Sequence, residues 1–463
     1  MMTRLTTCVA SAALLLAAVP AVASAQHIGR TKWDSTARDL FKELIEINTT
    51  ESSGSTLKAA QAMAARLKAA GFPDSDVVVV KQNDRKGNLV ARLRGRNVSR
   101  KPLLLLSHID VVEAKPEDWT LPPFTFVEKD STFFGRGVAD DKDDGAMHLT
   151  TIMRLKAEGY RGNRDIIVAL TTDEEGGPDN GVDYLLKNHR PLIEAEYAFN
   201  EGGGGRVRDG KYLSHDIQAA EKVYADFRLE VTNPGGHSSQ PVKENAIYQL
   251  AQALVKIGAY DFPVHLNDVT RTYFERSAAI TPGKMGEAMK ALAANPNDAA
   301  AIATLSSDKA YNSQLRTSCV ATMLEGGHAP NALPQRARAN VNCRILPNDP
   351  PAEIQKTLER VIGDPKVAIT VTQAPKPSGP SPLTRELMGE IEGVTKEMWP
   401  GVPVIPTMST GATDGVYMRN AGIPVYGVTG FFYNETFAHG MNERIPQQGF
   451  FNGMEFTYRL VKR

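Results

Sequence analysis

The spacing of hydrophobic residues along the chain alternates between a helical and a strand pattern. Apolar residues recur every three or four positions in two runs within residues 36–72, which is typical of amphipathic helices. Short apolar runs follow at residues 77–80, 89–93 and 103–106, and the last is typical of a strand buried on both faces. The alternation then continues with a helix at 145–158, a strand at 166–170, a helix at 182–189 and a strand at 197–199. This order predicts an α/β domain with an open, mostly parallel sheet.

The pattern changes near residue 219. Residues 224–231 alternate between apolar and polar positions, as a half-exposed antiparallel strand does, and residues 245–258 have helical spacing. A proline-rich stretch at 374–380 then leads back to alternating strand and helix patterns. These end in a helix from about residue 447. We therefore predict an inserted α+β domain at 219–375 between two parts of a catalytic domain, 26–218 and 376–463.

The first 25 residues are typical of a secretory signal peptide. Arg4 precedes a short apolar run at 8–19, and Ala23-Ser24-Ala25 fits the small-residue rule for cleavage. The run is too short to span a bilayer as a helix. We predict an exported protein, periplasmic or secreted, cut after Ala25; an uncleaved membrane anchor is the alternative.

Composition and charge exclude several classes of protein. The chain has 463 residues, of which 42% are hydrophobic and 23% charged, as in an ordinary globular protein with a large core. Its 53 basic residues balance its 53 acidic ones, so no charge excess favours nucleic acid or an anionic membrane surface as a partner. Neither is expected to bind the mature protein.

Two cysteines remain after the signal peptide is removed. Cys319 and Cys343 both lie in segments with strand character, in a protein expected in an oxidising compartment. A cross-strand disulfide and a pair of buried thiols are both consistent with this pattern.

Acidic residues and histidines follow the predicted strands. In an open α/β sheet, ligands bind at the carboxyl ends of the strands, so these side chains are expected at one edge. The chemistry-bearing positions are His108 and Asp110, the pair Asp140-Asp141, the pair Glu174-Glu175, then Glu201 and finally His439.

This set of side chains suits a pair of metal ions. Two imidazoles and three carboxylates provide one histidine and one carboxylate for each zinc ion, plus a carboxylate shared by both. A fourth carboxylate beside a ligand could accept the proton of an attacking water, and the pair Glu174-Glu175 supplies both roles. Taken singly, a histidine is more often a surface or core residue, and an acid after a strand is often a helix cap. Their repetition at one sheet edge favours the metal interpretation.

The motifs that carry this chemistry resemble those of metallopeptidase family twenty. That family includes carboxypeptidase S, glutamate carboxypeptidase, aminoacylase and succinyl-diaminopimelate desuccinylase. The resemblance is carried, in order along the chain, by the segments at 107–112, 135–142, 172–177, 200–203 and 234–239 and by His439.

The resemblance implies a function for each acidic and histidine position. It implies that two zinc ions, with Co²⁺ or Mn²⁺ as substitutes, are held by His108, Asp140, Glu175, Glu201 and His439. Asp140 would bridge the two ions, Asp110 would orient His108, and Glu174 would be the general base.

The resemblance also implies that the inserted domain is a lid through which the protein forms a homodimer. His237 matches the lid histidine that reaches the partner subunit's site and stabilises the oxyanion, while Asn331 and Arg344 match lid residues that bind the substrate's carboxylate or carbonyl. Gly411 begins a loop that resembles the substrate loop of the catalytic domain. Without the resemblance, the sequence pattern indicates only that Asn331 is a turn residue and that Arg344 is a solvated residue of a strand. An extra helical segment at about 262–316 is similar to the carboxypeptidase S-like branch.

The sequence as a whole predicts an exported two-zinc amidohydrolase. We expect it to cleave a peptide or N-acyl bond next to a free carboxylate, so its partners are peptides or N-acyl amino acids. An aminopeptidase or dipeptidase on the same scaffold is the alternative, followed by a catalytically silent binding protein. A serine hydrolase is disfavoured because no Gly-x-Ser-x-Gly turn follows a strand.

Overall fold

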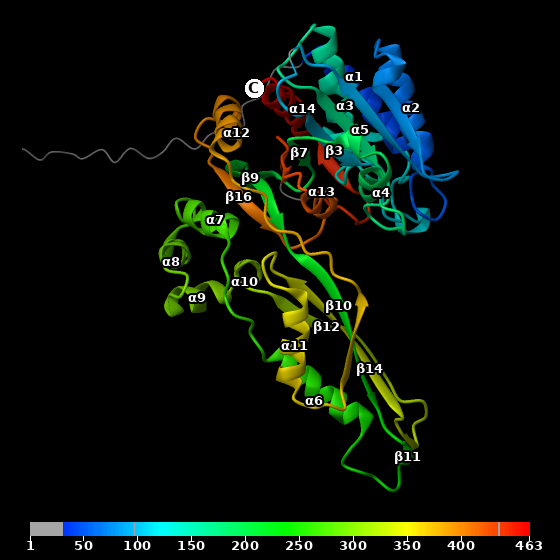
Figure 1. The fold of residues 1–463 in the computed structure, drawn as a ribbon, viewed down its shortest axis with the longest axis vertical. Helices are drawn as coiled ribbons and strands as arrows, with labels where there is room; N and C mark the ends of the chain where they lie inside the picture. The colour runs from blue at the N-terminus through cyan, green and yellow to red at the C-terminus, as the bar shows by residue number, and fades with distance from the viewer. Residues whose placement is uncertain (1–30, 97, 434–435) are drawn as a thin grey trace, which may run out of the picture.

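The computed structural model describes residues 31–96, 98–433 and 436–463, and it is elongated, with a large α/β body at one end (Figure 1). The predicted signal peptide lies outside these ranges. In the described residues no helix has the length and apolar character needed to cross a membrane. An extended arm of strands and helices leaves the body after residue 221, and the chain returns to the body between residues 373 and 385 (Figure 1).

The body is built on a ten-stranded mixed sheet. The strand order is β1-β2-β6-β3-β7-β17-β9-β8-β18, with β16 pairing with β9 outside this path, and the pairs β6–β3, β3–β7 and β7–β17 at its centre are parallel. This confirms the α/β fold class. The strands are β1 (Val77–Lys81), β2 (Gly87–Leu93), β3 (Leu103–His108), β6 (Ile166–Thr171), β7 (Tyr197–Asn200), β8 (Gly204–Arg208), β9 (Lys211–Glu221), β16 (Val404–Ser409), β17 (Val425–Gly427) and β18 (Phe432–Tyr433).

Helices cover both faces of this sheet. In β3, Leu103 and Leu105 join one buried cluster, with residues of α1, α2, α3, α12 and α14, whereas Leu104 and Leu106 join another, with residues of α4 and α13. Burial on both faces explains the unbroken apolar run in this strand. The helices of the body are α1 (Asp34–Glu46), α2 (Thr56–Ala69), α3 (Lys142–Ala157), α4 (Gly181–Asn188), α5 (Arg190–Ile193), α12 (Arg385–Met398), α13 (Gly415–Asn420) and α14 (Gln447–Val461), with short 3₁₀ turns η1 (Asp74–Asp76) and η2 (Pro116–Asp118).

Helix α3 begins at Lys142, three residues before the predicted start at Gly145. Its first turn contains Asp143 and Asp144, and acidic residues are common near the unpaired N–H groups of a helix start. The prediction of the helix start was wrong because it relied on the apolar spacing, which begins only after these acids. A small antiparallel sheet beside the body consists of β4 (Val127–Lys129), β5 (Thr132–Phe134) and β19 (Arg444–Pro446).

A second sheet forms the arm, which we call the lid. It has the order β12-β14-β10-β15 and is antiparallel throughout, with α6 and α11 packed against it over a separate buried cluster. The chain passes from the first sheet to the second at Lys222, between β9 and β10. The elements of the lid are β10 (Val223–Thr232), β11 (Gly236–His237), α6 (Ala246–Gly258), β12 (Ser318–Gly326), β13 (Ala332–Leu333), β14 (Arg336–Ile345), α11 (Pro351–Ile362) and β15 (Ala368–Gln373).

Cys319 and Cys343 form a disulfide across the lid sheet. The two residues are directly opposite each other in the pairing of β12 with β14, and their Cα atoms are 4.1 Å apart. The disulfide alternative is confirmed, and the alternative of two buried thiols is wrong.

The helical segment at 262–316 packs on the body. It contains α7 (Asp268–Ala278), α8 (Gly283–Ala294), α9 (Ala299–Ser306) and α10 (Lys309–Leu315), and Figure 1 shows α7 beside β16. Phe274 and Leu305 share a buried cluster with Ile405 of β16. Arg276 donates to the backbone oxygen of Val404 at 2.8 Å. The segment therefore leaves the lid, contacts the ten-stranded sheet of the body and returns to β12.

Candidate metal centre and substrate pocket

The predicted side chains gather where three neighbouring parallel strands end. β3 ends at His108, β6 is followed by Glu174 and Glu175, and β7 is followed by Glu201. Because these strands are adjacent and parallel, their carboxyl ends meet at the same edge of the sheet.

His108, Asp140 and Glu201 form one group of potential metal ligands. The Nε2 atom of His108 lies 3.0 Å from Oδ1 of Asp140 and 4.0 Å from Oε1 of Glu201. One ligand atom from each residue falls within 4.8 Å of the others. The His108 side chain is buried, so this group is shielded from water on the imidazole side.

Asp140, Glu175 and His439 form a second group. The Nε2 atom of His439 lies 2.9 Å from Oδ2 of Asp140 and 2.7 Å from Oε1 of Glu175. Hydrogen bonds that His439 donates to the Asp140 and Glu175 carboxylates raise its pKa to about 10, so metal binding there would release a proton. Asp140 thus belongs to both groups and turns one carboxylate oxygen toward each imidazole.

This donor set fits two zinc ions. Imidazole nitrogens and carboxylate oxygens are among the ligands that zinc takes, and each group offers three of them, which leaves a coordination position for water or substrate. A carboxylate that faces both groups with separate oxygens is suited to bridge two ions. The five residues predicted as ligands are all members of these groups.

Asp110 supports the site in a different way from the one expected. The Nδ1 atom of His108 lies 3.0 Å from the backbone oxygen of Asp110, whereas the nearest carboxylate oxygen is 3.7 Å away. The carboxylate instead accepts the backbone N–H groups of Glu174 at 3.2 Å and Glu175 at 2.9 Å. Asp110 therefore contacts His108 through its main chain and fixes the Glu174-Glu175 turn through its side chain.

Burial dominates the electrostatics of the acids. It raises the pKa of the Glu174 and Glu201 carboxyls well above their ordinary value and that of Asp110 to about 7. Several carboxylates so close together disfavour ionisation, and cations held among them would favour it. This cluster of carboxyl groups therefore favours the binding of cations.

Two buried polar contacts near the site had no clear signal in the sequence. Asn180 donates from Nδ2 to Oδ1 of Asp414 at 2.5 Å and to the backbone oxygen of Asp173 at 3.1 Å. Glu443 accepts the backbone N–H groups of Ala139 at 2.8 Å and Gly137 at 3.2 Å, and so holds the loop that carries Asp140. Asp414 lies in the 411–415 loop that was singled out for Gly411, but the roles of Asn180 and Glu443 depend on pairings between distant loops.

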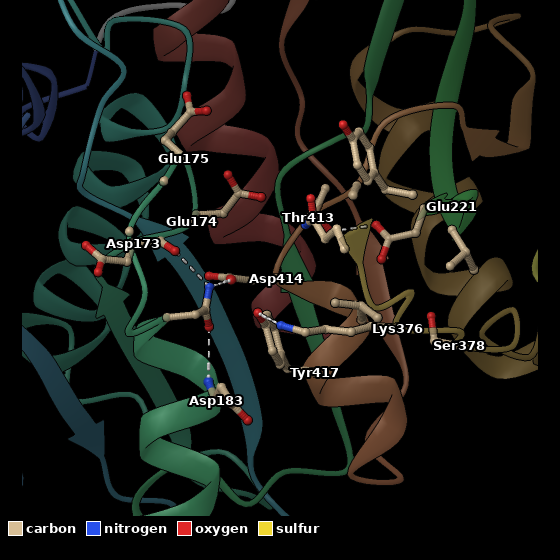
Figure 2. A pocket seen from close by; sticks show the side chains of 18 of the residues that line it. Asp173, Glu174, Glu175, Asp183, Glu221, Lys376, Ser378, Thr413, Asp414 and Tyr417 are labelled. Carbon is tan, nitrogen blue, oxygen red and sulfur yellow. Dashed lines mark hydrogen bonds between the residues drawn. The ribbon is translucent and has the colours of Figure 1, made fainter. Parts of the chain in front are cut away.

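A cavity of about 510 Å³ adjoins Glu174 and Glu175. Its walls come from the loop after β6, the junction of β9 with β10, the stretch after β15 and the start of α13. Figure 2 shows Glu174, Thr413, Asp414 and Lys376 around this space. It is a candidate substrate pocket because it borders the proposed ligand Glu175 and the proposed base.

The predicted lid residues lie in two separate places. The Nη1 atom of Arg344 donates to the backbone oxygen of Thr410 at 3.2 Å, which brings Arg344 next to Gly411. His237 and Asn331 are exposed near the tip of the lid, where β11 pairs with β13. Figure 1 shows β11 at the opposite end of the molecule from β3 and β7, so one chain does not bring His237 or Asn331 to its own metal groups.

Comparisons with known proteins agree with this geometry. Residues 104–463 match the model of peptidase family M20/M25/M40. The chain is 29% identical over 391 residues to a probable carboxypeptidase S-like 2 of Dictyostelium discoideum, covering 81% of this chain and 74% of the relative. It is 27% identical over 384 residues to the N-fatty-acyl-amino acid synthase/hydrolase PM20D1 of Homo sapiens, covering 80% and 75%.

A solved structure has the same fold. The M20 family metallo-carboxypeptidase Sso-CP2 from Sulfolobus solfataricus matches with a TM-score of 0.69 at 20% identity, over 92% of this chain and 98% of that one.

Proposed function

The chain belongs to peptidase family M20/M25/M40 and is a metal-dependent hydrolase of amide bonds, and from this premise we propose that it is an exported two-zinc enzyme. Its substrates would be peptides or N-acyl amino acids cleaved next to a free carboxylate. The observation that carries the two-metal proposal is the position of Asp140, which contacts His108 with one carboxylate oxygen and His439 with the other.

The proposed metal ligands are His108, Asp140 and Glu201 for one ion, and Asp140, Glu175 and His439 for the other. Bound zinc ions would polarise the scissile carbonyl and increase the acidity of the attacking water.

Glu174 is proposed as the general base. Its backbone N–H donates to the Asp110 carboxylate, which fixes the turn that carries Glu174 next to the proposed ligand Glu175. The Glu174 carboxylate takes the proton from the attacking water and then passes it to the leaving amine. Burial raises its pKa and thereby strengthens it as a base, while neighbouring cations would keep it ionised at neutral pH.

Arg344 and the loop at Gly411 are proposed to bind the substrate's carboxylate. The guanidinium of Arg344 already meets this loop at Thr410, and two parallel N–H donors suit a carboxylate. The alternative, an aminopeptidase or dipeptidase, would instead recognise a free α-amine. Names of the relatives support the first choice, since they include a carboxypeptidase S-like protein and an N-fatty-acyl-amino acid hydrolase.

A homodimer through the lid is also proposed. β12 is an edge strand of the lid sheet, and it exposes 71% of Met323 and 72% of Leu324, while Val255 of α6 is 72% exposed. Apolar side chains along an unpaired strand edge favour association with another copy. In such a dimer His237 would reach the partner's site and stabilise the oxyanion, and Asn331 would accompany it.

Metal analysis combined with a substrate panel tests the proposal. We expect two zinc ions per chain, and hydrolysis of N-acyl amino acids or C-terminal peptides in preference to amides without a carboxylate. Glu174→Gln should retain both ions and lose at least about 100-fold in kcat, because the proton acceptor is removed without loss of a ligand. Exposed Glu117→Gln is the matched control and should behave as the wild type.

Two results would contradict the assignment. Near-normal turnover by Glu174→Gln would show that this residue is not the general base. Full activity after complete chelation of the metal would rule out the metal-dependent mechanism. Amino-terminal sequencing of the mature protein tests export, which requires a chain that begins after Ala25.

A further inference from the structure

The cavity beside the proposed base extends from the metal groups towards Lys376. Glu174 and Glu175 line one part of it, and Lys376, Tyr417 and Ser378 line another (Figure 2). Lys376 belongs to the stretch that returns from β15 to the body, and Tyr417 belongs to α13.

Most acids that line this cavity are already neutralised or held by hydrogen bonds. Asp173 is paired with Lys86, Asp183 with Lys187 at 2.6 Å, and Glu221 with Arg419. Asp414 accepts hydrogen bonds from Asn180 at 2.5 Å and Thr171 at 3.3 Å. Apart from the Glu174-Glu175 pair of the metal site, the lining therefore offers no acid that is left without a partner.

The lysines of the lining have no such compensation. Lys376 donates from Nζ to the Tyr417 hydroxyl at 2.5 Å and lies 4.3 Å from the centre of its ring. Lys222 is buried, and its Nζ donates to the backbone oxygen of Arg316 at 2.8 Å and to the Ser318 hydroxyl at 3.4 Å, two residues outside the cavity lining. Among the described residues, neither lysine forms an ion pair with a carboxylate. At this end of the cavity Lys376 therefore offers an ammonium group that no ion pair neutralises.

The residue composition of the lining disfavours a long hydrocarbon chain. Among the described residues that line it, the aliphatic side chains larger than alanine are Pro178, Val223 and Val416. A fatty chain would lie against charged and hydroxyl groups here, which costs free energy because those groups would lose water without gaining a partner.

We propose that this cavity receives a second anionic group of the substrate, remote from the scissile amide, such as the side-chain carboxylate of an aspartate or glutamate residue. The Lys376 ammonium and the Tyr417 hydroxyl donate to that carboxylate. Lys376 and Tyr417 are then specificity-determining residues. The inference deepens the proposed function, since it names the substrate class of the same site.

Direct binding tests it without relying on turnover. The affinities of metal-loaded Glu174→Gln protein for N-acetyl-L-glutamate and N-acetyl-L-glutamine are compared by calorimetry, because the two ligands differ in side-chain charge and little in shape. We expect the glutamate ligand to bind about threefold more tightly, because Lys376 is exposed and water weakens its attraction for the carboxylate. Adding Lys376→Gln should abolish this preference, and Lys376→Arg should restore most of it.

Lys366→Gln in the same background is the matched control, because this exposed lysine of the lid is already paired with Glu244 and lies outside the cavity lining. Equal affinity for the two ligands, or no binding of either, would overturn the inference. An undiminished preference in Lys376→Gln would overturn the assignment to this residue. A protein that binds glutamate selectively but hydrolyses no amide would leave this inference standing while the proposed function failed.

Discussion

A single side-chain amide joins two loops of the candidate active site. Asn180 donates to the backbone of Asp173, one residue before the proposed base, and to the carboxylate of Asp414 in the loop that follows Gly411. Its Oδ1 atom also caps α4 by accepting the N–H of Asp183 at 3.1 Å. One residue therefore sets the spacing between the base and the proposed substrate loop.

Replacing Asn180 by serine separates these two tasks. Serine retains an oxygen that can cap a helix, but it removes the amide donor that ties the loops together. We expect kcat to fall about tenfold with a nearly unchanged KM and unchanged metal content, because small displacements of a catalytic group slow the reaction more than they weaken binding. Asn188→Ser at the other end of α4 is the control. Wild-type kcat in Asn180→Ser, with or without a lower melting temperature, would reduce this residue to a structural role.

At the residue scale, the sequence predicted which side chains gather but not every contact they make. His108, Glu175 and Glu201 could be predicted because each follows a strand whose place in a parallel sheet brings it to one edge. The contacts of Asp110 could not, since its carboxylate accepts from two backbone groups of another loop. Hydrogen bonds of this kind depend on how the loops fold in three dimensions. Loop conformation produces no periodic pattern of residues in the sequence.

At the scale of elements, strands were easier to predict than helix starts and packing partners. Continuous apolar runs marked the central strands because both of their faces are buried, as in β3. The start of α3 was misplaced because its first turn consists of charged residues. Nothing in the pattern of residues 262–316 indicated that these helices pack on β16, because an amphipathic face does not specify which surface will cover it.

The disulfide between β12 and β14 is expected to stabilise an otherwise exposed edge strand. The cysteines are 24 residues apart, and on the chain-entropy model such a cross-link contributes about 3 to 4 kcal/mol. Replacing both cysteines by alanine should lower the free energy of unfolding of the lid by this amount, measured by denaturant titration. Wild-type protein treated with a reductant should match the double variant. A change below about 1 kcal/mol would show that the cross-link is incidental to the stability of the lid.

At the scale of the whole molecule, the distance between the lid tip and the metal groups argues for two chains working together. His237 lies on β11, at the far end of the lid from β3 and β7 (Figure 1). If His237 acts in the site of a second subunit, His237→Ala and Glu174→Gln homodimers should each be inactive.

Mixing these two variants should restore part of the activity. A heterodimer contains one site with an intact Glu174 that receives an intact His237, so about one quarter of wild-type kcat is expected after random exchange, in which half of the dimers are mixed and each has one intact site. Subunit exchange is verified by differently tagged chains, and size-exclusion chromatography with light scattering measures the oligomeric state. Exchange without recovered activity, or a monomer in solution, would contradict the shared site.

The packing of α7–α10 on β16 determines which parts of the protein can be exchanged with relatives. Ile405 of the body is fully buried by helices whose chain begins and ends in the lid. A chimaera that grafts a foreign lid without these helices would leave Ile405 facing water and deprive Phe274 and Leu305 of their partners. Lid, helices and the strand beneath them therefore form one engineering unit, and recombination breakpoints belong outside all three.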